Sequence, residues 1–143
     1  MKATLTAIAP APVKPSAGNL AVCLEPCAWD RSNARRTFDA GVKKLYVAFD
    51  YANIPPGAHY ERVWRLLGRG EWVRYDCTWP GPGTGTTDVT LTEPAGLHDG
   101  TWEVSIIVDG VTILQDTIFL AGNWDAWYPS GVFNTCFGKR ASN

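Results

Sequence analysis

The sequence predicts an all-β protein that folds as a sandwich of about seven strands. Three observations lead to this prediction. The apolar segments are short, most of them alternate with a period of two residues, and Gly, Pro, Asn or Asp separates one from the next. No segment keeps a long helical period. With 143 residues, the chain is long enough for one domain with a single core.

The composition excludes several classes of protein. Hydrophobic residues make up 45% of the chain and charged residues 19%, which is typical of globular rather than disordered proteins. The formal net charge is −1, and the arginine cluster of Arg31, Arg35 and Arg36 is most simply a solvated loop, so nucleic acid is not an expected partner. No apolar run approaches the ~20 residues of a membrane-spanning helix, so no membrane span is expected.

Residues 1–18 are interpreted as a Pro- and Ala-rich arm or linker in front of the sandwich. This segment lacks the long apolar stretch of a signal peptide. We nevertheless expect an extracellular or cell-surface protein, from which an export signal or an upstream domain has been removed.

The first half of the expected sandwich, which spans residues 19–122, contains three strands. The stretch NLAVCL gives a short first strand, and KKLYVAFDY alternates so that Leu45, Val47, Phe49 and Tyr51 share one face. The stretch YERVWRLL fits either a helical spacing or a strand. Because Pro and Gly bound it on both sides, it is short for a stable helix, and a strand is favoured.

Four further strands are expected in the second half. EWVRYDCTW forms a hairpin with the preceding strand, and DVTLT follows the loop GPGTG. An Asp-Gly turn joins GTWEVSIIV, in which Trp102, Val104, Ile106 and Val108 alternate, to GVTILQDTIFL. The loop glycines are not expected to bind phosphate, because the lysine and the following helix of a phosphate-binding loop are absent from this stretch.

Residues 123–143 form an aromatic tail that follows neither the strand period nor the helix period. Exposed apolar surface of this size is a liability, so the tail is expected to pack on its own domain. Docking of the tail on a partner is the alternative.

The cysteines Cys23, Cys27, Cys77 and Cys136 predict disulfides, since an even number permits two bridges in three connectivities. A bridge between Cys77 and Cys136 would fasten the tail. Free core thiols and a metal site are the alternatives, and the metal site is the least expected because only Cys23 and Cys27 form a close pair. Disulfides would indicate an oxidising compartment. No cofactor or metal ion is expected.

Three stretches carry a family resemblance over residues 38–122: LYVAFDYANIPPGAHYERVW, GPGTG and LTEPAGLHDGTWEVSIIVDG. They resemble the bacterial extracellular immunoglobulin-like β-sandwich modules that occur as accessory or surface domains. The resemblance implies that Trp64 is the core tryptophan of the third strand and that LHDGTW forms a corner, with Trp102 in place of the usual tyrosine. An indole only donates, so it is not expected to copy the tyrosine hydroxyl bond. The resemblance implies a fold and brings no catalytic residues.

The favoured function is a non-catalytic module that binds a protein partner or assembles with its own copies, as in a filament, surface layer or particle coat. The alternative is a carbohydrate-binding accessory domain of a secreted enzyme, because flat aromatic rings stack on sugars. The candidate binding surface is Trp79, Trp124, Trp127 and Tyr128. A small hydrolase is the least favoured class, since both histidines fall in predicted turns, no nucleophile motif is present and a small sandwich offers little cleft.

Overall fold

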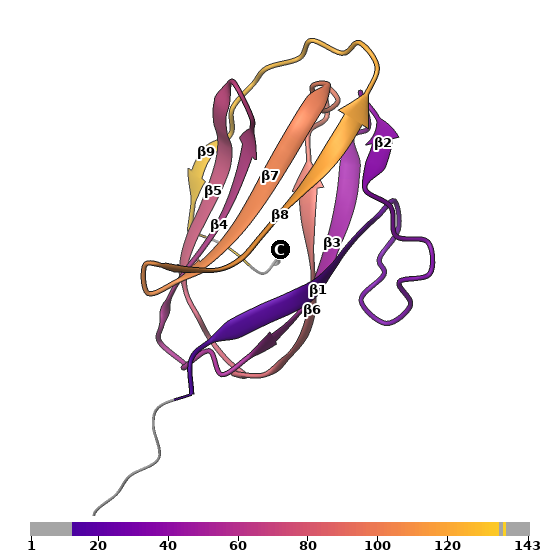
Figure 1. The fold of residues 1–143 in the computed structure, drawn as a ribbon. Coiled ribbons are helices and arrows are strands. Elements are labelled where there is room, and N and C mark those ends of the chain that lie inside the picture. Colours follow the sequence, from indigo (N-terminus) through magenta and orange to yellow (C-terminus); the bar gives the residue numbers. More distant parts are fainter. Residues whose placement is uncertain (1–12, 135, 137–143) are drawn as a thin grey trace, which may run out of the picture.

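The chain folds into two β-sheets (Figure 1), in a computed structural model that describes residues 13–134 and Cys136. These residues form nine strands: β1 (Ser16–Cys23), β2 (Thr37–Asp39), β3 (Lys44–Ala52), β4 (His59–Leu66), β5 (Gly70–Thr78), β6 (Gly85–Thr92), β7 (Gly100–Val108), β8 (Val111–Ala121) and β9 (Gly131–Phe133). The all-β prediction is confirmed. Within the same residues there is no helix that could cross a membrane.

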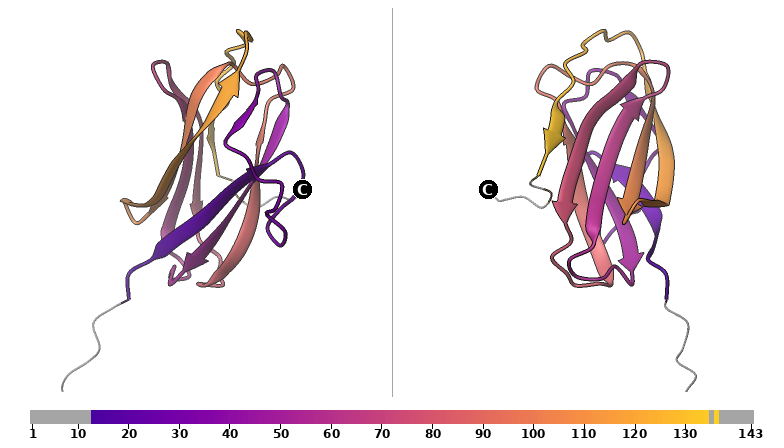
Figure 2. Two further views of the ribbon diagram at one scale, coloured as in Figure 1. Left: turned by 45° about the vertical axis from the view of Figure 1, so that its right-hand side comes forward. Right: turned by 90° about the vertical axis from the view of Figure 1, so that its left-hand side faces the viewer.

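The two sheets face each other as the layers of a sandwich (Figure 2). One sheet has three strands in the order β1-β3-β6, and the other has six in the order β2-β8-β7-β4-β5-β9. The long strands pair antiparallel, whereas the short strands β2 and β9 pair parallel to β8 and β5. The described residues thus form nine strands where about seven were expected; the two short strands are additional, and β1 begins inside the stretch 1–18 that was interpreted as an arm.

The first strand begins at Ser16, earlier than the stretch NLAVCL suggests, because Ser16 already pairs with Ala52 of β3. The ladder is interrupted between Gly18 and Ala21, where Asn19 has a positive φ of 54°. This irregularity hides the early part of the strand from an analysis of alternation.

The core between the sheets contains both alternating faces that the sequence predicts. The residues of these two faces are all buried: Leu45, Val47, Phe49 and Tyr51 of β3, and Trp102, Val104, Ile106 and Val108 of β7. The ambiguous segment YERVWRLL is a strand, and Trp64 in it is fully buried. Opposite Trp64, a bulge in β5 turns both Trp72 and Val73 inward. The rings of Trp72 and Trp102 meet edge to face at 5.6 Å.

The corner before β7 makes a bond that was not expected of it. The Trp102 indole donates from Nε1 to the carbonyl oxygen of His98, four residues upstream, at 2.9 Å. The expectation that an indole cannot take the place of the tyrosine hydroxyl is therefore wrong here. The reason is that the bond needs only a donor, which the indole supplies.

All four cysteines are paired, as Cys23–Cys27 and Cys77–Cys136. The Cα atoms of the two pairs are 6.3 Å and 6.2 Å apart, within the usual range for disulfides. The predicted disulfides are thus formed, and the second one fastens the tail to β5.

The described part of the tail packs on its own sandwich. After β8 the chain crosses one end of the sandwich and then runs down beside β5 as β9 (Figure 1). Trp127 lies half-buried against Trp72, with ring centroids 5.2 Å apart. The remaining tail residues, 135 and 137–143, lie outside the described residues.

Candidate functional site

The four aromatic residues predicted as a binding surface do not lie together. Trp79 follows β5, whereas Trp124, Trp127 and Tyr128 follow β8, which runs antiparallel to β5 in the same sheet. These two groups therefore lie at opposite ends of the sandwich. They cannot contact one ligand of the size of a short oligosaccharide.

Trp79 is buried, with only 2% of its surface exposed. Its indole donates from Nε1 to the carbonyl of Pro82 at 2.8 Å, and its ring packs on Tyr51 and Tyr60 at 4.9 Å and 5.0 Å. The loop turns inward because the Trp79 backbone bonds to the backbone of Gly57 and Ala58. Trp79 thus offers no face to solvent, contrary to the sugar-stacking hypothesis.

The other three residues differ in exposure. Trp124 is partly exposed, and its indole donates to the carbonyl of Ala95 at 2.9 Å. Trp127 is covered, because the guanidinium of Arg69 lies 4.9 Å from the centre of its ring. Tyr128 is 64% exposed. Of the four candidate residues, Trp124 and Tyr128 present exposed surface at this end of the sandwich, where Leu67 in the turn after β4 is exposed as well.

The largest exposed ring lies elsewhere, in the loop of residues 24–36 between β1 and β2. Trp29 in this loop is 85% exposed, the highest value of any large hydrophobic side chain in the described chain. The loop projects beside the three-stranded sheet, at the right of Figure 1, away from the strand β9. Sequence analysis missed Trp29, although a tryptophan two residues after the Cys23–Cys27 pair in a polar stretch was a usable indication.

The first half of this loop is held to the three-stranded sheet. The Cys23–Cys27 disulfide closes it onto the end of β1. The backbone N–H groups of Cys27 and Ala28 donate to the carboxylate of Asp88 in β6, at 3.5 Å and 3.1 Å. Ala28 and both cysteines pack with Ala21 and Ala48 in a small second core. These residues point away from the main core, so the loop covers the outer face of the sheet.

Arg31 holds the second half of the loop. Its Nη2 lies 2.7 Å from Oδ1 of Asp50 in β3, its Nη1 donates to the carbonyl of Asn19, and its Nε donates to the carbonyl of Ala28 at 3.1 Å. The side-chain hydroxyl and the backbone N–H of Ser32 both donate to the carboxylate of Asp30. These bonds lower the pKa of Asp30, and the bond from the hydroxyl has the larger effect. The residues on both sides of Trp29 are therefore fixed, while the indole itself is not covered.

A hollow of about 620 Å³ lies on the same loop. Its walls combine apolar, acidic and basic side chains: Cys23, Leu24, Glu25, Pro26, Cys27, Asp30, Ser32, Asn33, Ala34 and Arg35. Leu24 is itself half-exposed. We call Trp29, Leu24 and this hollow the Trp29 surface. Trp29 is not part of the wall of the hollow but lies next in sequence to the wall residue Asp30, so one loop presents an exposed indole together with charged groups, a combination typical of protein interfaces.

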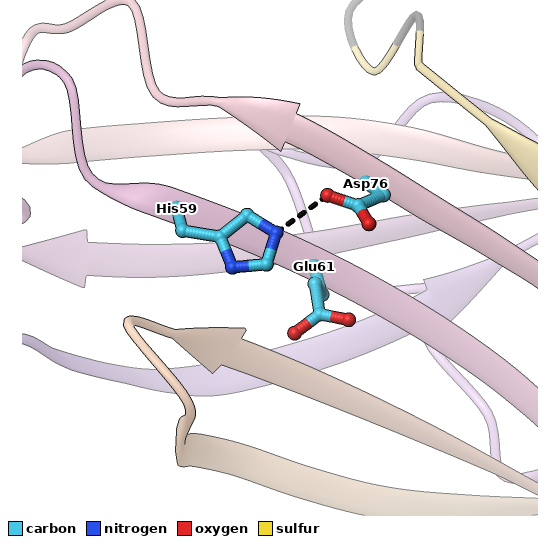
Figure 3. A group of neighbouring side chains, drawn as sticks. All are labelled: His59, Glu61 and Asp76. Carbon is cyan, nitrogen blue, oxygen red and sulfur yellow. Dashed lines mark hydrogen bonds and ion pairs between the residues drawn. The ribbon is translucent and has the colours of Figure 1, made fainter.

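A second group of polar side chains lies on the outer face of the six-stranded sheet (Figure 3). His59 and Glu61 come from β4, and Asp76 comes from β5. Nε2 of His59 is 2.5 Å from Oδ1 of Asp76, and this hydrogen bond is the main cause that raises the pKa of His59. Glu61 pairs with the guanidinium of Arg74. From the sequence, His59 was predicted to lie in a turn without neighbouring functional groups. The group of three side chains could not be predicted, because their proximity depends on the register between β4 and β5.

Comparison with models of known protein families gives no match, and comparison with curated protein sequences gives none either.

Proposed function

We propose that this chain is a non-catalytic, extracellular binding module of the immunoglobulin-like class, and that it docks a protein partner through the Trp29 surface. The observation that carries the proposal is the 85% exposure of Trp29 on a loop whose neighbouring residues are fixed. The two disulfides support a location in an oxidising compartment.

The strand order supports the immunoglobulin-like class. With β2 and β9 set aside, one sheet has the order β1-β3-β6 and the other β8-β7-β4-β5. The first, second and fifth of these seven strands face a sheet of the last two, the third and the fourth. This matches strands A, B and E and strands G, F, C and C′ of the variable-type arrangement, without its D and C″ strands. The buried Trp64 on the third long strand and the Trp102 corner agree with it.

The energetics favour a protein partner with an apolar pocket. Burial of an indole that is 85% exposed would remove enough apolar area to contribute about 4 kcal/mol. Because the disulfide and Arg31 already order the loop, little conformational entropy is lost on binding. Charged groups at the rim, Glu25, Asp30 and Arg35, would select partners by charge complementarity.

Site-specific photo-crosslinking tests the proposal. Trp29 is replaced by benzoylphenylalanine in one variant and Tyr128 in a control, since both rings are exposed but lie on different parts of the molecule. We expect a discrete protein adduct from position 29 only. With that partner purified, Trp29→Ala should weaken binding by about 30-fold or more, as expected for a hot-spot residue. Equal adducts from both positions, or none from position 29, would overturn the proposal.

Self-assembly is the homotypic form of the same proposal, in which the partner is a second copy of the chain. It would give an adduct of twice the chain mass and a concentration-dependent sedimentation coefficient that Trp29→Ala abolishes. A carbohydrate-binding accessory domain is the second candidate function, because an exposed indole can also stack on a sugar. In that case polysaccharides should quench tryptophan fluorescence in the parent protein and leave Trp29→Ala unchanged.

A further inference from the structure

We propose that His59, Glu61 and Asp76 form a binding site for a divalent transition-metal ion, Zn²⁺ in particular (Figure 3). The possible ligand atoms are one ring nitrogen of the histidine and one oxygen from each carboxylate, and they all lie within 4.8 Å of one another. This inference concerns a different face of the molecule from Trp29 and does not depend on the proposed function.

The strands place the three side chains together. His59 and Glu61 are two residues apart on β4, so they point to the same side of the sheet, while Tyr60 between them is buried on the other side. Asp76 is the partner of Glu61 in the ladder with β5. A site on two paired strands is held more rigidly than one on a loop.

The ligand types favour zinc over calcium and magnesium. Zn²⁺ accepts imidazole nitrogen together with carboxylate oxygen, whereas Ca²⁺ and Mg²⁺ prefer shells made of oxygen alone. Three protein ligands would leave one position of a tetrahedral shell for water or for a group from another molecule. The ion would replace the hydrogen bond between His59 and Asp76, and their two ligand atoms, now 2.5 Å apart, would separate to the roughly 3.3 Å of a tetrahedral zinc shell.

The surroundings suit a cation. Glu61 and Asp76 bring two negative charges, and the guanidinium of Arg74, which pairs with Glu61, also pairs with Glu71 at 3.0 Å. Arg74 would orient Glu61 from behind, in the way that outer-shell partners orient metal ligands. The backbone N–H of His59 donates to Asp109 at 2.9 Å and fixes the start of β4. The His59 side chain is 52% exposed, so an ion can reach it from solvent.

Calorimetric titration with zinc tests the site. It uses the tag-free protein after treatment with a chelator, in buffer without reducing agent. All four cysteines are in disulfides, so thiols do not compete under these conditions. We expect one ion per chain. Loss of an outer-shell partner commonly weakens metal binding by about 10–100-fold, so His59→Gln and Asp76→Asn, which remove ligands directly, should each weaken it by about 100-fold or more. Co²⁺ should give the visible bands of a tetrahedral complex in the parent protein.

His98→Gln is the matched control. His98 also faces a carboxylate, with 3.0 Å between its Nε2 and Oδ1 of Asp125, but it lies outside the group of three ligand atoms. Its variant should bind zinc like the parent, and circular dichroism should show that the metal-free variants are folded. Absence of saturable zinc binding by the parent, or undiminished binding by the folded His59→Gln variant, would overturn the proposal.

Discussion

The Arg31 guanidinium joins the loop that carries Trp29 to Asp50 at the far end of β3, with 2.7 Å between Nη2 and Oδ1. The same Asp50 carboxylate accepts hydrogen bonds from Asn19 of β1 at 2.8 Å and from Thr86 of β6 at 2.7 Å. One side chain of the central strand therefore joins the loop and both outer strands of the three-stranded sheet. The position of Trp29 depends on this arrangement.

Removal of the guanidinium should loosen the loop while the fold is kept. In Arg31→Ala we expect faster hydrogen exchange of the backbone amides in residues 24–36 and a loss of about 1 kcal/mol in the free energy of unfolding, because the ion pair is partly exposed. The control is Arg35→Ala, since the Arg35 guanidinium lies over the Phe38 ring and does not bond to Asp50. Equal hydrogen-exchange rates of residues 24–36 in the two variants would show that Arg31 does not hold the loop in place.

Acid should weaken the same arrangement. Hydrogen bonds from Asn19, Thr86 and Arg31, in this order of importance, lower the pKa of Asp50 from 3.8 to about 2. Because the pKa is lower in the folded state, the ionised carboxylate stabilises the fold at pH values above 3.8, its pKa in the unfolded chain. This stabilisation is lost as the pH falls through about 2, the pKa in the folded state.

The stability difference between the parent protein and Asp50→Asn should therefore shrink between pH 3.8 and about 2. Urea unfolding at both ends of this range measures it. Since the carboxylate is partly exposed, the change should be smaller than the pKa shift alone implies. A difference that stays constant with pH would show that Asp50 acts by shape and not by charge.

A methyl group at Gly96 should dislodge Trp124 from its place at the end of the sandwich. A Cβ atom there would lie 2.6 Å from Nε1 of Trp124 and 2.7 Å from the carbonyl oxygen of Gly41. Gly57 has nearly the same φ, 87° against 89°, but a Cβ atom there would meet nothing within 4 Å.

Gly57→Ala should consequently cost about 1–2 kcal/mol from backbone strain alone, and Gly96→Ala should cost clearly more. The excess reports the close packing of Gly96 against Trp124 of the tail and against the Gly41 backbone. Thermal unfolding of both variants measures the two losses, and equal losses would mean that Trp124 and the Gly41 carbonyl both move aside freely.

The two disulfides should differ in their contribution to stability. Cys77–Cys136 closes a sequence separation of 59 residues and Cys23–Cys27 one of 4. Loop-closure entropy then predicts about 4 kcal/mol for the long loop and about 2 kcal/mol for the short one. Denaturant unfolding of the two double Cys→Ser variants tests this order. A larger loss for the short loop would indicate that its native contacts, rather than entropy, are what the bridge protects.

The long strands could be predicted from the sequence because each buries one alternating face, as β3 and β7 do. The strands β2 and β9 could not, since three residues hold no period and their parallel partners are fixed by the tertiary fold. The bulge that buries Trp72 beside Val73 likewise leaves no mark in the sequence pattern.

The candidate surfaces were harder to predict, because exposure of a tryptophan depends on where its loop turns. Trp79 and Trp29 both sit in loops beside a cysteine, yet the first is turned inward by backbone bonds and the second outward. The group around His59 follows from the pairing of Glu61 with Asp76, which needs the register of the hairpin and not only its existence.

The bridge from Cys136 to Cys77 also decides how the molecule would respond to mechanical load. A pull on the chain beyond Cys136 passes through the sulfur atoms directly to the end of β5. The segment between the two cysteines, which contains β6, β7, β8 and β9, carries none of this tension while the bridge is intact. About 200 Å of contour length is thereby withheld from extension, so a stretched molecule could lengthen only through the strands that precede Cys77.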